Sequence, residues 1–307
     1  MSGKDIVVTG GAGFIGSWIA ETLSSENKVT VIDNLHTGKM KNLKGFADRI
    51  RFINADIRDR EAVFEGVKGA ELVFHQGANV IIQASIDDPK MNSEINVGGT
   101  LNVLEACRKH DVKRVIFASS SAIYGNTEKL PVTEDQDPSP LSPYALSKLE
   151  GEKWMKIYSE KYGLETVTLR YFNVYGPRQY PDSPYSGVIS IFTKNIRTGK
   201  PLTVFGDGEQ TRDFVSVRDV VNANLLAAES RKGVGKTFNI GTGKSVSLNE
   251  MISILEKLAG KKTKVVYDKP RHGDVRHSRA DITLAKDVLG YSPAVSLEEG
   301  LKELLFP

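Results

Sequence analysis

The sequence has little of the chemistry that marks several large classes of protein. It holds a single cysteine, Cys107, which excludes an intrachain disulfide framework and a cysteine-based zinc site and favours a reducing compartment. No apolar run approaches the ~20 residues that a membrane-spanning helix requires. The first residues show no apolar signal segment with a small-residue cleavage site. These features predict a cytoplasmic protein that does not bind a membrane.

Charge of one sign is also lacking. The chain has 41 Lys and Arg against 38 Asp and Glu, a formal net charge of +3, and the basic residues are scattered along it. Proteins that bind nucleic acid through its phosphates usually carry a basic patch or stripe. The charge pattern therefore argues against nucleic acid as a partner.

What is present is the composition of an ordinary globular protein. The 307 residues are 40% hydrophobic and 26% charged, values typical of soluble domains. A chain of this length buries a full core and forms either one large α/β domain or two lobes around one cleft. Composition does not choose between these two, or choose a function.

The first half of the chain alternates short β-branched runs with longer helical patterns. Because a strand, a helix and a second strand in this order require right-handed crossovers, the pattern predicts a doubly wound parallel sheet with helices on both faces. Strands are expected at residues 6–9, 28–33, 49–55, 72–75, 114–118 and 166–170, and helices at 14–25, 61–66, 91–110 and 144–162.

The rhythm changes after Asn173. Residues 175–186 contain three prolines and no regular period, which indicates a loop. We expect one domain over 1–173, a smaller α/β domain over 174–307, and a strand near 236–241 that returns to the main sheet. Helices are expected at 188–198, 217–229, 248–258 and 284–289, and strands at 202–205, 237–240 and 264–266.

A glycine-rich turn joins the first strand to the first helix. Gly11, Gly13 and Gly16 match the dinucleotide fingerprint, and Gly10 fits an overlapping version of it. Glycines let the backbone amides and the helix N-terminus approach a pyrophosphate. Asp33, at the end of the next strand, stands where an acid would bind the adenosine ribose and repel a 2′-phosphate, so NAD is preferred over NADP. An ordinary glycine turn with Asp33 as a turn former is the alternative.

A second pattern indicates acid and base chemistry. Tyr144 and Lys148 open the long helix four residues apart, so they share one face. An ammonium and a cationic nicotinamide ring both favour the phenolate, which makes Tyr144 a usable general acid and base. A serine run at the end of a strand, residues 119–121, supplies a hydroxyl for the substrate oxygen and the tyrosine.

These motifs together resemble the extended short-chain dehydrogenase/reductase family. The resemblance rests on residues 9–16 (TGGAGFIG), 119–125 (SSSAIYG), 142–148 (SPYALSK) and 170–173 (RYFN). Within the family the chain is similar over essentially its whole length to the NAD-dependent UDP-hexose 4-epimerases. The resemblance implies a Rossmann-like NAD domain, a C-terminal substrate domain, tightly held NAD and a homodimer.

The family's site residues transfer to matching positions of this chain. The catalytic hydroxyl falls on Ser120, with Ser121 as the alternative, beside Tyr144 and Lys148. The resemblance implies that NAD contacts Gly10, Gly13, Phe14, Ile15, Gly16, Asp33, Asn34, Thr37, Gly38, Asp56, Ile57, Gln76, Ala78, Asn96, Ser119, Tyr144 and Lys148. It implies that the UDP-sugar contacts Ser120, Ser121, Tyr144, Asn173, Val188, Arg212, Arg271, Asp274 and Ser278, with Asn173, Arg212 and Arg271 at the diphosphate and Asp274 at the uridine ribose.

The reaction follows from what stands beside the serine. Relatives that dehydrate or decarboxylate sugar nucleotides carry a carboxylate just after the hydroxyl, and here those positions are Ser121 and Ala122. The resemblance therefore favours 4-epimerisation through a transient 4-keto sugar. A net oxidoreductase such as a 4-reductase, and a non-catalytic NAD-sensing protein, are the alternatives. His272 and His277 lack the neighbours that would complete a metal site.

Two positions bear on the choice of sugar. The resemblance puts Ser278 at a gate where a small residue admits 2-acetamido sugars, so UDP-GlcNAc and UDP-GalNAc are expected beside UDP-Glc and UDP-Gal. Val80 and Ile81 replace small or polar residues of related members. They either line the sugar pocket or serve ordinary packing.

Overall fold

The computed structural model describes residues 1–180, 187–270 and 275–306. Its centre is a seven-stranded, fully parallel sheet with the strand order β11-β6-β5-β4-β1-β2-β3. This order reverses beside β1, as in a doubly wound fold, and confirms the predicted fold class. The strands are β1 (Asp5–Thr9), β2 (Lys28–Asp33), β3 (Ile50–Asn54), β4 (Leu72–His75), β5 (Arg114–Ser120), β6 (Glu165–Tyr171) and β11 (Thr237–Ile240).

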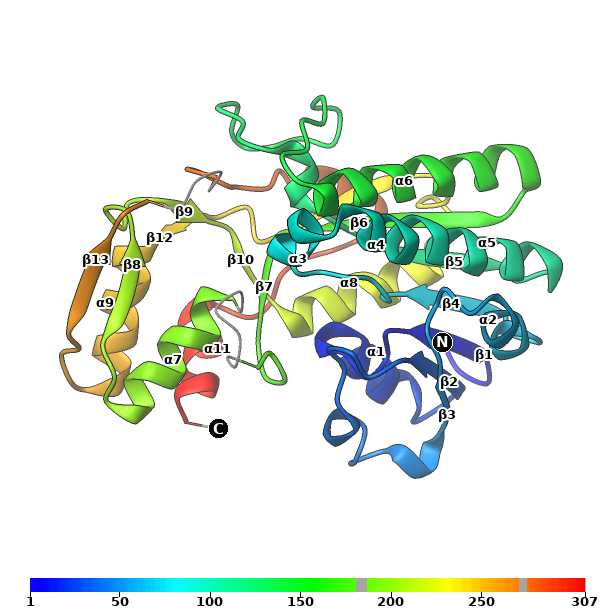
Figure 1. Ribbon diagram of the computed structural model, residues 1–307, viewed down its shortest axis with the longest axis horizontal. Helices are drawn as coiled ribbons and strands as arrows, with labels where there is room; N and C mark the ends of the chain where they lie inside the picture. The colour runs from blue at the N-terminus through cyan, green and yellow to red at the C-terminus, as the bar shows by residue number, and fades with distance from the viewer. Residues whose placement is uncertain (181–186, 271–274, 307) are drawn as a thin grey trace.

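Helices cover both faces of this sheet (Figure 1). One face packs on α1 (Phe14–Leu23) and α8 (Val217–Glu229), and the other on α2 (Arg60–Val67), α5 (Gly99–Lys109) and α6 (Pro143–Tyr162). Two separate apolar clusters result, one on each side. Covered strands such as β1 and β4 are therefore apolar on both faces, which explains why their sequences show no alternation.

Helix α6 has clear start and stop signals. The Ser142 side chain accepts a hydrogen bond from the backbone N–H of Ala145, and Pro143 occupies the first turn. The helix ends at Gly163, which adopts a left-handed conformation with φ of 73°. These signals place the predicted helix within one residue of its observed start.

A second lobe lies beside the sheet, on the left of Figure 1. It has its own apolar cluster, to which a small parallel pair of strands contributes Leu202 and Val204. Its elements are α7 (Val188–Thr198), β8 (Leu202–Phe205), α9 (Leu248–Ala259), β13 (Val265–Asp268) and α11 (Leu297–Leu305). Short pairs join β7 (Asn173–Tyr175) to β10 (Phe214–Ser216) and β9 (Thr211–Arg212) to β12 (Val246–Ser247).

Several elements after residue 173 pack with the first half of the chain. Strand β11 pairs with β6, with Thr237 opposite Thr168. Helix α8 and α10 (Thr283–Leu289) contribute Val220 and Leu289 to the cluster that also holds α1. The division into domains 1–173 and 174–307 therefore stays a prediction, and the core that α1 belongs to draws on both ranges.

The single helix expected over 91–110 is wrong. The chain instead forms α4 (Pro89–Ser93), a π-helical turn η3 (Glu94–Gly98) and then α5. The buried side chain of Asn96 in this turn bonds the loop that follows β4, a contact that helical periodicity does not reveal. Further short elements that were not predicted are α3 (Ile82–Asp87) and the 3-10 turns η1 (Met40–Asn42), η2 (Ala47–Arg49) and η4 (Ser121–Tyr124).

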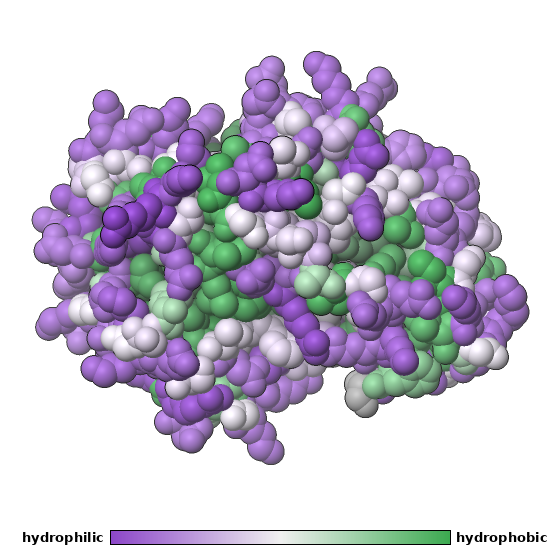
Figure 2. Space-filling view, turned by 180° about the vertical axis from the view of Figure 1, so that it is seen from behind, coloured by the Kyte–Doolittle hydropathy of each residue, from purple (hydrophilic) through white to green (hydrophobic). Residues whose placement is uncertain are grey.

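Hydrophilic side chains dominate the periphery of the face seen in Figure 2, and apolar residues show mainly toward its interior. Among the described residues, no helix is both long enough and apolar enough to cross a bilayer.

Candidate active site

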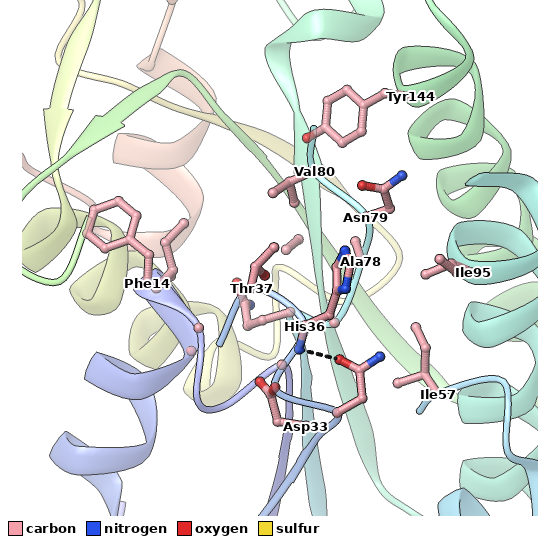
Figure 3. Close-up of a pocket in the computed structure, with 18 of the residues that line it drawn as sticks. Phe14, Asp33, His36, Thr37, Ile57, Ala78, Asn79, Val80, Ile95 and Tyr144 are labelled. Carbon is pink, nitrogen blue, oxygen red and sulfur yellow. Dashed lines mark hydrogen bonds between the residues drawn. The ribbon is translucent and has the colours of Figure 1, made fainter. Parts of the chain in front are cut away.

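A cavity of about 670 Å³ opens at the carboxyl ends of the central strands. Its lining comes from the turn after β1, the end of β2, the loop after β4, the end of β5 and the start of α6. Figure 3 shows that Asp33 and Tyr144 lie at opposite ends of this lining, with Thr37 and Ala78 between them. The carboxyl edge at the reversal of strand order is where open α/β sheets bind their ligands.

The turn after β1 requires glycine. Gly10 has a φ of 66°, and a Cβ on it would lie 2.7 Å from the backbone nitrogen of Gly77. A Cβ on Gly16 would lie 2.2 Å from the carbonyl oxygen of Gly10. No described side chain caps the N-terminus of α1 at Gly13. The first-turn N–H groups are thus available to an anion in the cavity.

The Asp33 side chain bonds the backbone of this turn. Its carboxylate accepts hydrogen bonds from the backbone N–H groups of Ala12 (2.9 Å) and Leu35 (2.8 Å). Burial raises the pKa of Asp33, and these backbone donors oppose that rise. Gly38 packs against the same carboxylate, since a Cβ there would lie 2.6 Å from Asp33 Oδ1. Asp33 therefore supports the glycine turn and also faces the cavity.

Beside Asp33, three further polar residues, Asn34, Asp56 and Arg58, form a linked group. Asn34 Nδ2 donates to Asp56 Oδ2 at 2.8 Å. Arg58 forms an ion pair with Asp56 at 3.0 Å and holds the pKa of that carboxyl below its ordinary value. Figure 3 marks the hydrogen bond from the His36 N–H to the Asn34 side chain, 3.0 Å long.

At the other end of the cavity stand the three residues expected to be catalytic. Lys148 is 4% exposed, and its Nζ donates to the carbonyl oxygen of Ala118 at 2.8 Å. Burial lowers the pKa of Lys148 to about 8, and the nearby Glu152 carboxylate acts in the opposite direction. Burial raises the pKa of the Tyr144 phenol, and the Ser120 hydroxyl counteracts this rise.

The helix start that carries Tyr144 is itself anchored. The backbone N–H of Tyr144 donates to the hydroxyl of Ser85, a buried residue of α3, at 3.1 Å. Ser120 Oγ accepts a bond from the N–H of Ala122 at 3.2 Å. The backbone of Tyr144 is therefore bonded to α3, and the backbone of Ser120 is paired with Tyr171 of β6.

Most of the expected NAD contacts meet in this one cavity. Gly38 does not line it and lies behind Asp33. Asn96 does not line it either: its amide bonds the N–H of Asn79 at 2.7 Å and the carbonyl of Asn79 at 3.0 Å, so it shapes the lining loop from behind. The lining includes Gly10, Gly13, Phe14, Ile15, Gly16, Asp33, Asn34, Thr37, Asp56, Ile57, Gln76, Ala78, Ser119, Tyr144 and Lys148. The roles of these residues stay predictions.

The expected substrate contacts are more dispersed. Ser120 and Tyr144 line the cavity, whereas Ser121 begins η4 and does not. Arg271 and Asp274 lie outside the described residues. The others lie at or beside the second lobe: Asn173 starts β7, Val188 starts α7, Arg212 ends β9, and the Ser278 N–H bonds the carbonyl of Thr211 at 3.1 Å.

Val80 and Ile81, the two positions that depart from related sequences, differ in whether they line the cavity. Val80 lines the cavity and appears between Phe14 and Tyr144 in Figure 3, whereas Ile81 is not part of the lining. His277 Nδ1 lies 3.0 Å from the hydroxyl of Thr211. Across the described ranges, no group of three His, Cys, Asp or Glu side chains is placed to hold a metal ion.

Sequence reasoning missed part of the lining. Tyr171, at the end of β6, could have been found from its place at the carboxyl edge of the sheet. Gln179 could not, because it comes from an irregular segment; its buried Oε1 has no hydrogen-bond partner among the described residues, and it lines the cavity. Arg58, Asn79 and Ile95 also lie in segments whose course depends on tertiary contacts.

Comparisons with known proteins agree with this geometry. The chain is 45% identical over 303 residues to a putative UDP-glucose 4-epimerase of Methanocaldococcus jannaschii, covering 98% of this chain and 97% of the relative. It matches the structure of a UDP-N-acetylglucosamine 4-epimerase from Methanobrevibacter ruminantium in complex with UDP-N-acetylmuramic acid, with a TM-score of 0.96, 39% identity and coverage of 99% and 98%.

It also matches the UDP-glucose 4-epimerase of Thermus thermophilus in complex with NAD, with a TM-score of 0.89, 39% identity and coverage of 98% and 97%. The model of the NAD dependent epimerase/dehydratase family matches residues 6–241, which include the glycine turn, Asp33 and the Tyr144 and Lys148 pair. The chain therefore belongs to the NAD dependent epimerase/dehydratase family.

Proposed function

We propose that the protein is an isomerase that interconverts UDP-hexoses at C4 through a transient 4-keto sugar, with NAD as its bound cofactor. The observation that carries this proposal is the shared cavity, in which Ser120, Tyr144 and Lys148 stand at one end and the glycine turn and Asp33 at the other. Relatives across the whole length of the chain are UDP-sugar 4-epimerases by name.

The residues present fit NAD. The N–H groups at the start of α1 suit its pyrophosphate, and the turn beside them has to be glycine, because a Cβ on Gly10 or Gly16 would collide with neighbouring backbone. Asp33 suits a ribose 2′-hydroxyl and disfavours a 2′-phosphate. When bound, NAD would supply the hydride acceptor and donor for C4 of the sugar.

The chain's own residues handle the proton. Tyr144, as phenolate, takes the proton of the sugar 4-hydroxyl while the C4 carbonyl forms, and it returns this proton when the carbonyl is reduced. Ser120 holds the sugar oxygen and the phenol through its hydroxyl. Lys148 keeps a positive charge in the same part of the cavity, which favours the phenolate.

A carboxylate next to Ser120 would support dehydration or decarboxylation, and Ser121 and Ala122 stand there instead. A 4-reductase on the same scaffold remains the alternative, because it needs the same hydroxyl, phenol and ammonium. The two differ in cofactor exchange, since an epimerase regenerates NAD within each turnover.

Cofactor content discriminates these candidates. We expect protein purified without added NAD to carry it at near one equivalent, and to epimerise without net accumulation of NADH. Turnover that consumes an external reduced cofactor in stoichiometric amounts would contradict the epimerase and favour the reductase. Tyr144→Phe serves as the control, because it should keep the cofactor and lose the turnover.

For the substrate, we propose that Asn173, Arg212 and Arg271 hold the diphosphate, that Asp274 holds the uridine ribose, and that Val188 and Ser121 complete the contacts. Guanidinium groups suit phosphate oxygens, and a carboxylate suits ribose hydroxyls. A small residue, Ser278, is proposed to admit the acetamido group of UDP-GlcNAc and UDP-GalNAc.

The Ser278 gate has a selective test. Ser278→Tyr should remove turnover of UDP-GlcNAc and UDP-GalNAc while leaving UDP-Glc and UDP-Gal close to the original rate, measured as kcat/KM on all four. Ser278→Ala, which stays small, is the matched control. An equal loss on both pairs of sugars would count against the gate.

We further propose a cytoplasmic homodimer. The thiol of Cys107 is fully buried, and burial raises its pKa, which suits an unreactive cysteine.

Leu146 and Ile157 on α6 are exposed apolar side chains (47% and 37%), as a helix that packs on a partner copy would have. Light scattering coupled to size exclusion should give twice the monomer mass.

A further inference from the structure

Helix α6 contacts the end of β5 at three successive levels. Tyr144, Lys148 and Glu152 follow each other at four-residue intervals, which places them on one face of the helix. Opposite them, the last three residues of β5 are Ala118, Ser119 and Ser120. The part of the strand that carries the catalytic hydroxyl is therefore bonded to the helix that carries the catalytic phenol and ammonium.

Of these three residues on α6, Glu152 is the one to which the proposed reaction gives no role. Its Oε1 accepts the hydroxyl of Ser119, and its two oxygens accept Arg170 Nε at 3.0 Å and the terminal guanidinium nitrogen at 2.8 Å. Both side chains of this ion pair are less than 10% exposed. Ser119 and Arg170 are themselves partners in the register of β5 and β6, so two adjacent strands converge on one carboxylate.

Arg170 is fixed on its far side. Its remaining nitrogen donates to the hydroxyl of Tyr124 at 2.6 Å and to the carbonyl of Glu134 at 3.0 Å. The Tyr124 hydroxyl in turn donates to Asn239 Oδ1 on β11 at 2.7 Å. These bonds fix the Arg170 guanidinium. Because two of its nitrogens bind the Glu152 carboxylate, that carboxylate is held in one position.

The charges around Lys148 give Glu152 a second effect. His75 on β4 faces Lys148, but burial lowers the pKa of His75 to about 3, so its ring is neutral at physiological pH. Arg170 on β6 is a cation, and Tyr144 on α6 is neutral until it ionises. Among the described residues, Glu152 is the carboxylate that acts on Lys148 and favours its ammonium form.

We propose that Glu152, clamped by Arg170 and Ser119, is a positioning residue of the reaction that holds the end of β5 in register with α6 and keeps Lys148 charged. The proposal deepens the epimerase function above and rests on it for the effect on turnover. Glu152 does not line the cavity, so it acts through Lys148 and through the backbone that carries Ser120.

The test compares Glu152→Gln with Glu152→Asp and with the control Glu160→Gln. Glu160 lies on the same helix, is exposed and pairs with Lys156 at 3.7 Å, so its loss should change nothing at the site. We measure the pH dependence of kcat and, separately, the ionisation of Tyr144 by ultraviolet difference absorbance, with Tyr144→Phe versions of each variant as blanks.

Removal of the negative charge lowers the pKa of Lys148. In Glu152→Gln we therefore expect the alkaline limb of kcat to move to lower pH by about 1 unit, and the ionisation of Tyr144, which loses the support of the ammonium, to move to higher pH. Glu152→Asp, which keeps the charge, should leave both near the original pH while kcat falls through the changed position of Ser119. Glu160→Gln should match the original protein.

A Glu152→Gln protein that folds and retains NAD but shows unmoved pH profiles overturns the proposal, even if its kcat is lower at every pH. If Glu152→Gln does not fold, Arg170→Lys decides: it keeps a positive charge but loses the two-nitrogen contact with Glu152, so the proposal expects a several-fold lower kcat, and an unchanged kcat overturns it. If the original protein converts no UDP-sugar, the proposed function fails, and the absorbance titration still tests Glu152.

Discussion

At the scale of single residues, the site combines groups whose preferred ionisation states oppose each other. Burial favours a neutral lysine and a protonated tyrosine, and it acts on both Lys148 and Tyr144. The catalytic scheme needs the opposite states, an ammonium and a phenolate. Tyr144 is therefore protonated in the resting site. The positive charges of Lys148 and of the nicotinamide ring stabilise its phenolate during turnover.

This balance gives a pH dependence with a definite sign. The pKa of Lys148, about 8, lies below its ordinary value, so its ammonium is present below pH 8 and is lost as the pH rises through it. We expect kcat/KM to fall above pH 8 by about tenfold per pH unit. Rates measured from pH 6 to 10 with UDP-glucose test this.

The control for that limb is Lys153→Met, which removes an exposed ammonium on the same helix and should leave the limb in place. A rate that stays level to pH 10 would show that Lys148 keeps its proton, in conflict with its burial.

Spacing was enough to predict which side chains would meet at the catalytic end. Tyr144 and Lys148 are one helical turn apart, and the serine run 119–121 was expected at the end of a strand, which brings both to the carboxyl edge; the choice of Ser120 within the run came from the family resemblance. The same reasoning could not find Gln179 or Asn79, because both stand in irregular segments: the Gln179 amide bonds the carbonyl of Val174, and the Asn79 N–H bonds the Asn96 side chain. It also could not tell that Asn96 supports the lining from behind.

At the scale of elements, the turn from β1 to α1 depends on an unusually close approach of two backbones. Gly10 and Gly77 belong to loops after adjacent strands, and a single added carbon on Gly10 would collide with the second loop. The width of the cavity at the glycine turn is thus set by two glycines rather than by side-chain packing.

A comparison of Gly10→Ala with Gly3→Ala separates the effect of the close backbone approach from the effect of backbone strain. Both glycines have a φ of 66°, so alanine strains each of them by a similar ~1 to 2 kcal/mol. A Cβ on Gly3 meets nothing within 4 Å, whereas one on Gly10 meets Gly77. Gly10→Ala should therefore lose a further ~1 to 3 kcal/mol of unfolding free energy and most of its bound NAD, and Gly3→Ala should retain NAD.

Denaturant unfolding and the NAD content of the purified variants measure both effects. Equal NAD content in the two variants would contradict the role assigned to the turn.

Several elements with strong local signals were predicted to the residue, although α11 was not predicted despite the capping box that begins it at Ser296. Capping residues or uninterrupted apolar runs mark their ends. Elements formed by tertiary contacts, such as α3, η3 and β9, were not predicted, because each is too short to show a period. The predicted bounds coincide with the observed ones for β2, β4, α7, β8, α8 and β11.

At the scale of the whole molecule, the chain crosses between its two parts more than once. After β7 it builds α7 and β8 of the second lobe, returns to lay α8 and β11 on the main sheet, and leaves again for α9 and β13 (Figure 1). The return of a strand near residues 236–241 to the main sheet was predicted, and β11 confirms it. The packing of α8 against α1 was not, because an amphipathic pattern shows that a face is buried without naming its partner.

This arrangement places the two parts of the proposed site on different bodies. The cofactor end belongs to the sheet, and the proposed diphosphate contacts Asn173 and Arg212 belong to the strands that lead into the second lobe. A nucleotide held by one body beside a reaction centre on the other suits a sugar that must present both faces of C4 to the same cofactor.

The most direct test of this account is the conversion of UDP-sugars by the purified protein without added cofactor. Incubated separately with UDP-Glc, UDP-Gal, UDP-GlcNAc and UDP-GalNAc, the protein should convert each into its 4-epimer, as resolved by chromatography, and approach the same final mixture from either member of a pair. Tyr144→Phe should slow every conversion by about 10² to 10⁴. Folded, NAD-containing protein that converts none of the four would contradict the proposed activity.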